Sequence, residues 1–392
     1  MRFQSYFNTA IKIIELYNGE IPLQHFLKNY FSENKKHGSK DRKFITHICY
    51  NFYRLGKAFI ECITEEKLKL AIFICNDNII DWHFLFDENW IDNWSNTLPE
   101  RIVFVQRKYS FSVGDIFPFK NDVSKEINAD AFIKSFLIQP DVFIRTRPHK
   151  YDVAVNKLQE HAITFKAITE DCIQLSSSTK IDTIIALDEE AVVQDLSSQR
   201  IKEFLSVVKA ENHQQKITVW DCCAGSGGKS ILAYDVLQNI DLTVSDVRPS
   251  IIQNLKQRFA KAGIKNYKSL VLDIANSKPK TDYSKYNLII CDAPCSGSGT
   301  WSRTPEQLYF FQPEKIDHYA LLQQKIISNA ITSLKENGFF LYITCSVFDK
   351  ENEQNALYIK QQFHLELIKM ELLKGYNNKA DTMFAALFQK TN

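Results

Sequence analysis

The sequence lacks any apolar run long enough to cross a membrane. Its longest apolar stretches, such as residues 339–345, fall far short of the ~20 residues that a spanning helix needs. The first residues, MRFQSYFNTAIKIIELY, alternate apolar and polar side chains at helical spacing instead of forming a continuous signal-peptide core. We therefore expect a soluble, cytoplasmic protein without a membrane partner.

The cysteines lack the patterns that mark a disulfide framework or a structural zinc site. They number nine, which is odd, no two are spaced as Cys-x-x-Cys, and the histidines are scattered along the chain. We expect reduced thiols, most of them core residues, and no metal.

The sequence also lacks a strong net charge, which is +2, but its charge is unevenly distributed. Residues 1–60 carry ten lysines and arginines against four acids, and five of these bases crowd into residues 35–43. Such a cluster can bind RNA phosphates, with Lys40 and Arg42 as candidates, or it can be an ordinary solvated face.

The pattern of apolar residues divides the chain into four parts. Residues 1–105 place apolar side chains at helical spacing and predict a small helical bundle. Residues 106–130 have no clear period and predict a linker. Residues 131–210 alternate short strands with helices, which predicts a small α/β subdomain, and residues 211–392 predict a larger α/β domain.

Two arginines alternate near the strand expected at residues 142–146. Arg145 and Arg147 would share one strand face, an arrangement that suits contacts to RNA phosphates. Exposed strand charges without a partner are the alternative.

The rest of the chain is organised around residues 217–229, ITVWDCCAGSGGK. The predicted strand there is followed by a glycine-rich loop and then by a helix that begins at Lys229. Such a loop presents backbone amides and a helix N-terminus to a ligand. Further strands and helices alternate after it, so we expect a mostly parallel, doubly wound sheet whose ligands bind at the carboxyl ends of the strands. This pattern predicts a nucleotide-type pocket.

Three acids follow three successive predicted strands beyond the glycine loop. Asp246 lies about as far past the loop as the acid that binds a ribose in nucleotide-binding sheets, and Asp273 and Asp292 end the next two strands. Each could be an ordinary turn or helix cap. The loop lacks the Gly-Lys-Ser/Thr ending of a P-loop, so it fits an adenosine with little phosphate, as in S-adenosylmethionine.

Two cysteines also follow predicted strands. Cys295 lies in DAPCSGSGT, just past one strand, and Cys345 lies in YITCS, at the end of the next. If the strands are neighbours, both thiols open into the pocket of Asp292. Packing in the core is the alternative role for these cysteines. Their neighbours in the loops are small or polar, however, which offers little apolar surface for a buried sulfur and favours a reactive, accessible thiol.

These segments resemble motifs of the RsmB-type, Sun-family RNA cytosine-5 methyltransferases, in similar order and spacing. The three main matches are DCCAGSGGK (221–229), DAPCSGSGT (292–300) and YITCSVFDKENEQN (342–355). Lesser matches are IRTRP (144–148), VVQDLSSQ (192–199) and DTMFAALFQK (381–390), while residues 37–57 resemble part of a NusB-like RNA-binding domain. The resemblance implies a Rossmann-like class I methyltransferase domain at 211–392, an RNA-binding subdomain at 131–210, a NusB-like domain at 1–105, and S-adenosyl-L-methionine as cofactor.

The resemblance also implies roles for single residues. Cys345 would add to carbon 6 of cytosine, Asp292 would hold ring nitrogen 3, and Cys295 would assist removal of the carbon 5 proton. Lys229 could favour thiolate or carboxylate charge. The cofactor-binding residues carried over are Cys223, Ala224, Gly225, Ser226, Gly227, Gly228, Lys229, Asp246, Asp273 and Asp292.

The glycine loop departs from the family pattern at one place. Gly225 and Ser226 stand where an Ala-Pro pair is usual, and the loss of a rigid proline should weaken cofactor binding by about 1 kcal/mol. Thr382 and Met383 also depart from the usual closing signature.

The implied partner is RNA, with 16S rRNA as our first choice and tRNA as the second, and we expect a monomer. A DNA cytosine-5 methyltransferase that uses Pro294-Cys295 is one alternative, disfavoured by the second cysteine and by the lack of a large insert. A non-catalytic RNA-binding scaffold is the other.

Overall fold

The computed structural model describes residues 2–212, 216–277 and 285–391. The chain folds into two compact units, each made of several segments. The first unit comprises Met1–Asn121, Asn128–Gln139 and Thr300–Gln312. The second comprises Asp122–Ile127, Pro140–Gly299 and Pro313–Asn392.

The first unit is all-helical among its described residues, as the helical spacing of its apolar side chains predicts. Its helices are α1 (Arg2–Leu16), α2 (Leu23–Glu33), α3 (Ser39–Arg54), α4 (Thr64–Cys75), η1 (Ile80–Leu85), α5 (Glu88–Asp92), α6 (Leu98–Lys108), η2 (Val113–Ile116), α7 (Ala129–Phe136) and α13 (Pro305–Phe310). A buried arginine ties three of its segments together, since Nη1 of Arg54 donates to the carbonyl oxygens of Phe136, Ile138 and Ser302.

Residues 106–130, which the sequence predicts to be a linker, are packed into the fold. They include the end of α6 and η2, and Ile116 and Phe117 are at most 1% exposed. The ring of Phe117 contacts the rings of Phe132 and Trp301. The structure differs from the prediction because these apolar side chains are buried without the regular spacing that identifies a helix.

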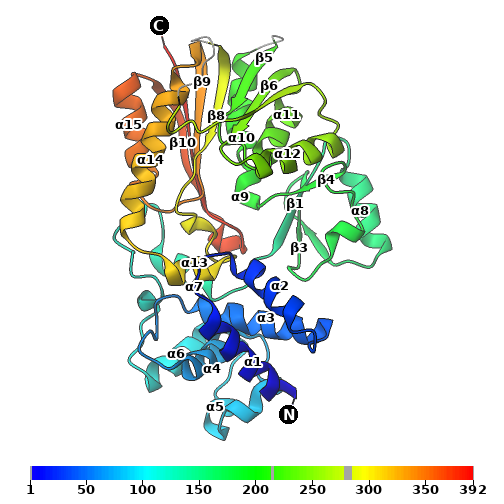
Figure 1. Ribbon diagram of the computed structural model, residues 1–392, viewed down its shortest axis with the longest axis vertical. Helices are drawn as coiled ribbons and strands as arrows, with labels where there is room; N and C mark the ends of the chain where they lie inside the picture. Colours follow the sequence, from blue (N-terminus) through cyan, green and yellow to red (C-terminus); the bar gives the residue numbers. More distant parts are fainter. Residues whose placement is uncertain (1, 213–215, 278–284, 392) are drawn as a thin grey trace. The chain divides into compact units, whose positions relative to one another are not determined.

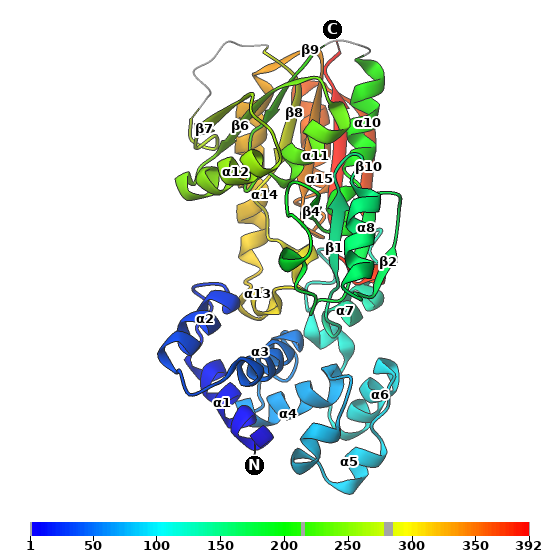
Figure 2. The same cartoon turned by 90° about the vertical axis from the view of Figure 1, so that its right-hand side faces the viewer.

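The second unit contains a small antiparallel sheet of order β2-β3-β1-β4. Its strands are β1 (Val142–Thr146), β2 (Phe165–Ala167), β3 (Cys172–Leu175) and β4 (Ala191–Val193). Helix α8 (Tyr151–Glu160) covers one face of this sheet, where Ala154 and Leu158 pack with Ile144 and Ile173 (Figure 2). A short η3 (Ile181–Thr183) precedes β4.

The second unit also contains a seven-stranded sheet of order β10-β11-β9-β8-β5-β6-β7. Its strands are β5 (Ile217–Asp221), β6 (Ile240–Asp246), β7 (Tyr267–Val271), β8 (Tyr286–Asp292), β9 (Leu334–Thr344), β10 (Glu366–Leu373) and β11 (Met383–Gln389). Strands β5 to β9 are parallel, and β11 runs antiparallel to both β9 and β10. The chain starts at the central β5, builds outward to β7 and returns beside β5 with β8, which creates a topological switch point there.

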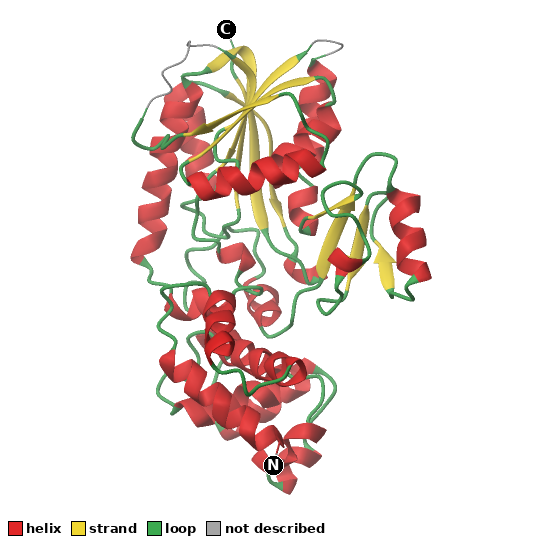
Figure 3. Cartoon of the chain, turned by 45° about the vertical axis from the view of Figure 1, so that its right-hand side comes forward, coloured by secondary structure: helices red, strands yellow, loops and turns green. Residues whose placement is uncertain are grey.

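Helices cover both faces of this sheet (Figures 1 and 3). They are α10 (Lys202–Glu211), α11 (Gly228–Leu237), α12 (Pro249–Lys261), α14 (Glu314–Ile331) and α15 (Glu353–Phe363). The short α9 (Leu196–Gln199) contacts β1 of the small sheet, and η4 (Ser298–Thr300) and η5 (Tyr376–Asn378) lie in loops. Helices α10, α11 and α12 share one core with the strands, and α14 and α15 lie on the opposite face. The mostly parallel, Rossmann-like sheet predicted from the sequence is confirmed.

Helix α10 belongs to this larger core although it lies before residue 211, the boundary that we predicted. Phe204, Leu205 and Val208 of α10 are buried with Val219 of β5. No helix within the described residues is both long enough and apolar enough to cross a membrane.

Candidate active site at the carboxyl ends of the central strands

The loop between β5 and α11 turns on two glycines in the left-handed region. Gly225 has φ 52° and Gly227 has φ 86°, conformations that side chains disfavour. A Cβ atom on Gly227 would lie 2.8 Å from the ring of Phe259, whereas one on Gly225 would meet nothing within 4 Å. Gly227 therefore permits close packing on α12, and Gly225 leaves the backbone open on its free side.

Asp246, at the end of β6, holds this loop. Its carboxylate accepts hydrogen bonds from the backbone N–H of Gly225 at 3.0 Å and of Arg248 at 2.9 Å. Burial alone would raise the pKa of Asp246, but its hydrogen bonds with Arg248 and Gly225 lower the pKa below its ordinary value. Asp246 is thus a fixed negative charge beside the glycine loop.

A cavity of about 600 Å³ opens where β5, β6 and β8 end. The predicted site residues that line it are Cys223, Gly225, Asp246, Asp273, Asp292 and Cys295. Its apolar lining includes Leu272, Ile274 and Ile326. Asp273 also caps its own turn, since its carboxylate accepts from the backbone N–H of Ala275 and from Nδ2 of Asn276. The cavity combines acids at strand ends with an apolar surface.

The other predicted loop residues lie away from the cavity lining. Ala224 is buried in the core, Gly227 packs on α12, and Ser226 is exposed. Gly228 and Lys229 form the first turn of α11.

The two predicted cysteines come together. Cys295 follows β8 and Cys345 follows β9, and these strands are parallel neighbours. The backbone N–H of Cys345 donates a hydrogen bond to Sγ of Cys295 at 3.3 Å. Both residues are half-buried. The thiol of Cys345 and burial raise the pKa of Cys295 well above its usual range.

Lys229 and Asp292 form an ion pair beside the cysteines. Nζ of Lys229 lies 2.6 Å from Oδ2 of Asp292, with the lysine side chain 11% exposed and the aspartate side chain 27% exposed. Burial alone would lower the pKa of Lys229, but Asp292 and then Cys345 raise it above its ordinary value. A cation is therefore fixed close to both Asp292 and Cys345.

Sequence reasoning missed Asp221, the last residue of β5. Its side chain is fully buried, and Oδ2 accepts a 2.6 Å hydrogen bond from the hydroxyl of Ser230. Among the described residues, its Oδ1 has no hydrogen-bond partner. Burial raises the pKa of Asp221 to about 7. The signal was present, because Asp221 ends its strand as Asp246 and Asp292 end theirs.

Glu351, which the sequence analysis did not identify either, holds both loops that carry the cysteines. Its buried carboxylate accepts hydrogen bonds from the backbone N–H of Ser296, the hydroxyl of Ser346 and Nε2 of Gln323. Burial raises its pKa. Ser296 follows Cys295 and Ser346 follows Cys345, so one side chain joins the two loops. The acids and amides after Cys345 in the sequence could have signalled this role.

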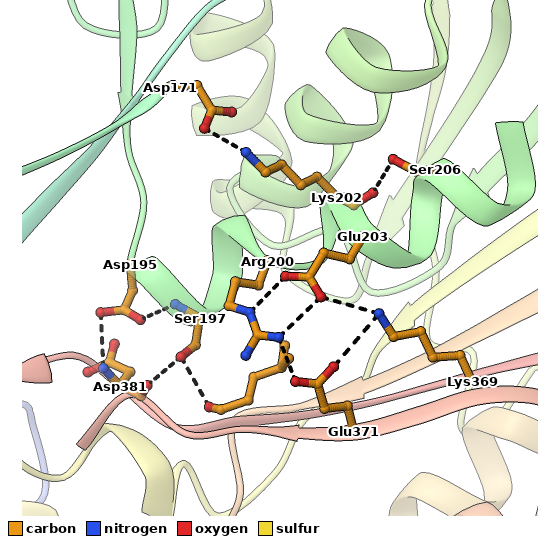
Figure 4. A network of polar contacts seen from close by, with 11 residues as sticks. Asp171, Asp195, Ser197, Arg200, Lys202, Glu203, Ser206, Lys369, Glu371 and Asp381 are labelled. Atoms are coloured by element: carbon orange, nitrogen blue, oxygen red, sulfur yellow. Dashed lines mark hydrogen bonds and ion pairs between the residues drawn. The ribbon is translucent and has the colours of Figure 1, made fainter. Parts of the chain in front are cut away.

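The segment before β11 completes the support of these loops. Thr382 is buried, and its N–H donates to the carbonyl oxygen of Gly299 at 2.9 Å. A Cβ atom on Gly299 would lie 1.9 Å from the carbonyl oxygen of Thr382, so glycine is required there. Figure 4 shows Asp381 held in turn by Asp195 and Ser197 at the start of α9.

The structure corrects the prediction for Arg145 and Arg147. Both pair with Asp235 of α11 at 2.8 Å, and their side chains are only 3% and 10% exposed. The strand face that carries them packs against the larger domain, so these guanidinium groups are already used inside the protein. Lys40 is exposed at the start of α3, while Arg42 donates to the carbonyl oxygen of His37.

Within the part of the chain that the structure describes, no group of three or more His, Cys, Asp or Glu side chains could hold a metal ion.

Comparisons with known proteins agree with this fold. Residues 206–390 match the family model described as 16S rRNA methyltransferase RsmB/F. The probable ribosomal RNA small subunit methyltransferase B of Bacillus subtilis (strain 168) is 25% identical over 231 residues, which cover 58% of this chain and 50% of that protein. The ribosomal RNA small subunit methyltransferase F of Psychromonas ingrahamii is 30% identical, with 40% and 33% covered. The chain thus spans at most about half the length of these two relatives.

Two solved structures share the fold. The crystal structure of PH0851 superposes with a TM-score of 0.73 at 18% identity and covers 98% of both chains. The structure of NSun6 from Pyrococcus horikoshii with SFG has a TM-score of 0.59 at 14% identity and covers 70% of this chain and 97% of that one.

Proposed function

We propose that the protein is an RNA methyltransferase that uses S-adenosylmethionine to form 5-methylcytosine, and the match of residues 206–390 to the RsmB/F family model supports this proposal. The observation that carries the proposal is the contact between Cys345 and Cys295 beside the Lys229–Asp292 ion pair. Two thiols in contact, a carboxylate and a cation are the groups that covalent catalysis on cytosine needs, and of these groups Cys295 and Asp292 line the cavity.

The residues at the cavity fit S-adenosylmethionine. The open backbone at Gly225 admits close approach of a ligand, Asp246 supplies a charged acceptor, and Leu272 and Ile274 offer an apolar surface for an adenine ring. Of the residues carried over from the resemblance, those that line the cavity are proposed to hold the cofactor: Cys223, Gly225, Asp246, Asp273 and Asp292. When bound, the cofactor would supply an electrophilic methyl group.

In the proposed mechanism, Cys345 acts as the nucleophile. Carbon 5 of cytosine is too poor a nucleophile to accept a methyl group until a thiolate has added to carbon 6. The ammonium group of Lys229, which pairs with Asp292, supplies a positive charge beside these groups. Asp292 uses Oδ2 for Lys229, which leaves Oδ1 to share a proton with ring nitrogen 3 and stabilise the charge that develops there.

Cys295 then assists release of the product. The thiol of Cys345 and burial raise the pKa of Cys295. In the proposed step, Cys295 gives its own proton to solvent and accepts the carbon 5 proton as a thiolate. The electron pair of that C–H bond reforms the ring double bond as the bond between carbon 6 and Cys345 breaks.

The proposed substrate is small-subunit ribosomal RNA, since the curated relatives carry that name, and tRNA is the second candidate. The target base must be turned out of its stack to reach the cavity, which costs a few kcal/mol in a helix. We therefore expect a cytosine in a loop or in unassembled RNA. Lys40 and Arg42 are the proposed phosphate contacts.

Trapping on RNA that contains 5-azacytosine tests the mechanism. The wild-type protein should form a covalent adduct that the Cys345→Ala variant does not form, while Cys295→Ala should accumulate enzyme bound to ordinary RNA. The opposite pattern would assign the nucleophile to Cys295, as in DNA cytosine-5 methyltransferases. Bisulfite sequencing of RNA with and without the gene identifies the cytosine, and an unchanged pattern would favour a non-catalytic scaffold.

A further inference from the structure

The outer side of the glycine loop is held by an arginine from α12. Nη1 of Arg258 donates hydrogen bonds to the carbonyl oxygen of Ser226 at 3.1 Å and to its hydroxyl oxygen at 3.0 Å. The rest of the guanidinium group pairs with Asp188, with Nε at 3.0 Å and Nη2 at 2.7 Å from Oδ1. Asp188 lies before β4 in the small sheet, so Arg258 joins that sheet to the loop.

The loop needs an external restraint at this place. Ser226 lies between Gly225 and Gly227, both left-handed, and glycine has more backbone freedom to lose than any other residue. Within the described residues, Arg258 supplies every hydrogen bond that Ser226 makes. A proline at position 226 would restrict the backbone by itself, but this chain has serine there.

Asp188 is a firm anchor for Arg258. Asp188 is 7% exposed. Its backbone N–H donates to the carbonyl oxygen of Ala191 at 2.8 Å, and its carbonyl oxygen accepts from Arg147 at 2.7 Å. Arg147 is fixed by its ion pair with Asp235. A guanidinium group held along one edge by a carboxylate presents its remaining N–H groups in a defined direction.

We propose that Arg258 is a positioning residue for the cofactor loop and replaces, through Ser226, the restraint that a proline would give. By fixing Ser226 it keeps Gly225 in the conformation that donates to Asp246 and leaves the loop backbone open to the cavity. This inference rests on the proposed function, because it assigns the loop to S-adenosylmethionine.

The first test compares Arg258→Gln with a matched control, Arg200→Gln. Arg200 also makes ion pairs with two elements, to Glu203 of α10 and Glu371 of β10 (Figure 4). Among the described residues, its side chain makes no hydrogen bond or ion pair with the glycine loop. Calorimetric titration with S-adenosylmethionine should show a dissociation constant about fivefold higher for Arg258→Gln and unchanged for Arg200→Gln. Equal affinities of wild type and Arg258→Gln would overturn the proposal.

Hydrogen exchange without cofactor gives a second readout. Loop amides of residues 222–228 should exchange faster in Arg258→Gln than in wild type or Arg200→Gln, and equal rates in all three would contradict the restraint. If the wild type does not bind S-adenosylmethionine, the proposed function fails, and exchange alone decides whether Arg258 restrains the loop.

A rescue experiment separates positioning from a general structural role. Ser226→Pro introduces a rigid residue and removes no hydrogen bond of the Ser226 N–H among the described residues. It removes the hydroxyl that accepts from Arg258 but keeps the carbonyl acceptor. In the Ser226→Pro background, Arg258→Gln should raise the dissociation constant less than about twofold. A loss as large as in the serine loop would show that Arg258 acts on the fold as a whole and would reject the proposal.

Discussion

The backbone N–H of Cys345 donates a hydrogen bond to the sulfur of Cys295. Because the donor belongs to the main chain, the spacing of the two thiols depends on where their loops lie. The register of β8 with β9, which pairs Asp292 with Ile343, brings the two loops side by side. Residues that hold these loops should therefore matter to the site although they cannot react themselves.

Glu351→Ala should lower the free energy of unfolding by about 3 kcal/mol. The change leaves the N–H of Ser296 and the hydroxyl of Ser346 without their buried acceptor. Glu351→Gln, which keeps one acceptor oxygen, should cost less. Urea denaturation measures both, and equal losses for the two variants would contradict the assigned role.

Gly227→Ala should destabilise the protein by about 2 kcal/mol or more, and Gly225→Ala by about 1 kcal/mol. Both glycines have positive φ, but only the Cβ on Gly227 would collide with Phe259. Thermal unfolding of the two variants side by side isolates the steric part. A larger loss for Gly225→Ala would be inconsistent with the packing described.

Asp221 should make stability depend on pH. Burial raises its pKa in the folded protein from 3.8 to about 7. A carboxyl group whose pKa is raised on folding stabilises the folded protein fully below about pH 4. This stabilisation falls as the pH rises from about 4 and is lost once the pH has passed 7. Between pH 4 and 7 the free energy of unfolding of the wild type should fall by about 1 kcal/mol per pH unit relative to that of Asp221→Asn, whose side chain cannot ionise. Urea denaturation at pH 5 and pH 7 measures the difference, and a constant difference would refute it.

Arg145 and Lys40 should respond differently when removed. Arg145→Gln breaks a buried ion pair with Asp235 and should cost about 3 kcal/mol of stability without altering the salt dependence of RNA binding. Lys40→Ala should leave stability unchanged and reduce the slope of log affinity against log salt by about one. Filter binding at several salt concentrations reports the slopes, and an unchanged slope for Lys40→Ala would remove this residue from the proposed RNA contacts.

Local patterns in the sequence were enough to predict the parallel strands of the large sheet and two strands of the small antiparallel sheet. The alternation from β5 to β9, and strands β1 and β3, follow from short apolar runs between helical segments, each decided by its own residues. The antiparallel β11 could not be found this way, because its place between β9 and β10 depends on pairing with residues ten or more positions away. The packing of residues 106–130 likewise depends on distant partners such as Trp301.

The candidate site shows the same division. The meeting of Cys295 and Cys345 follows from the order of the strands that precede them, which the sequence reveals. The burial of Arg145 and Arg147 could not be predicted in this way. Alternation along a strand does not reveal which face is exposed to water and which face packs on Asp235. Glu351 looks like any polar residue of a loop until its burial under both cysteines is known.

The contact between Thr382 and Gly299 bears on when the site forms during synthesis. A chain still being made on the ribosome exposes both cysteines well before residue 382 has emerged, so for that interval the loops lack the backbone partner and the strand that later flank them. The last of the contacts that flank the two thiols can therefore form only after β11 has been translated. Fragments that end before residue 382 would contain both cysteines but would lack the hydrogen bond and the strand that hold their loops.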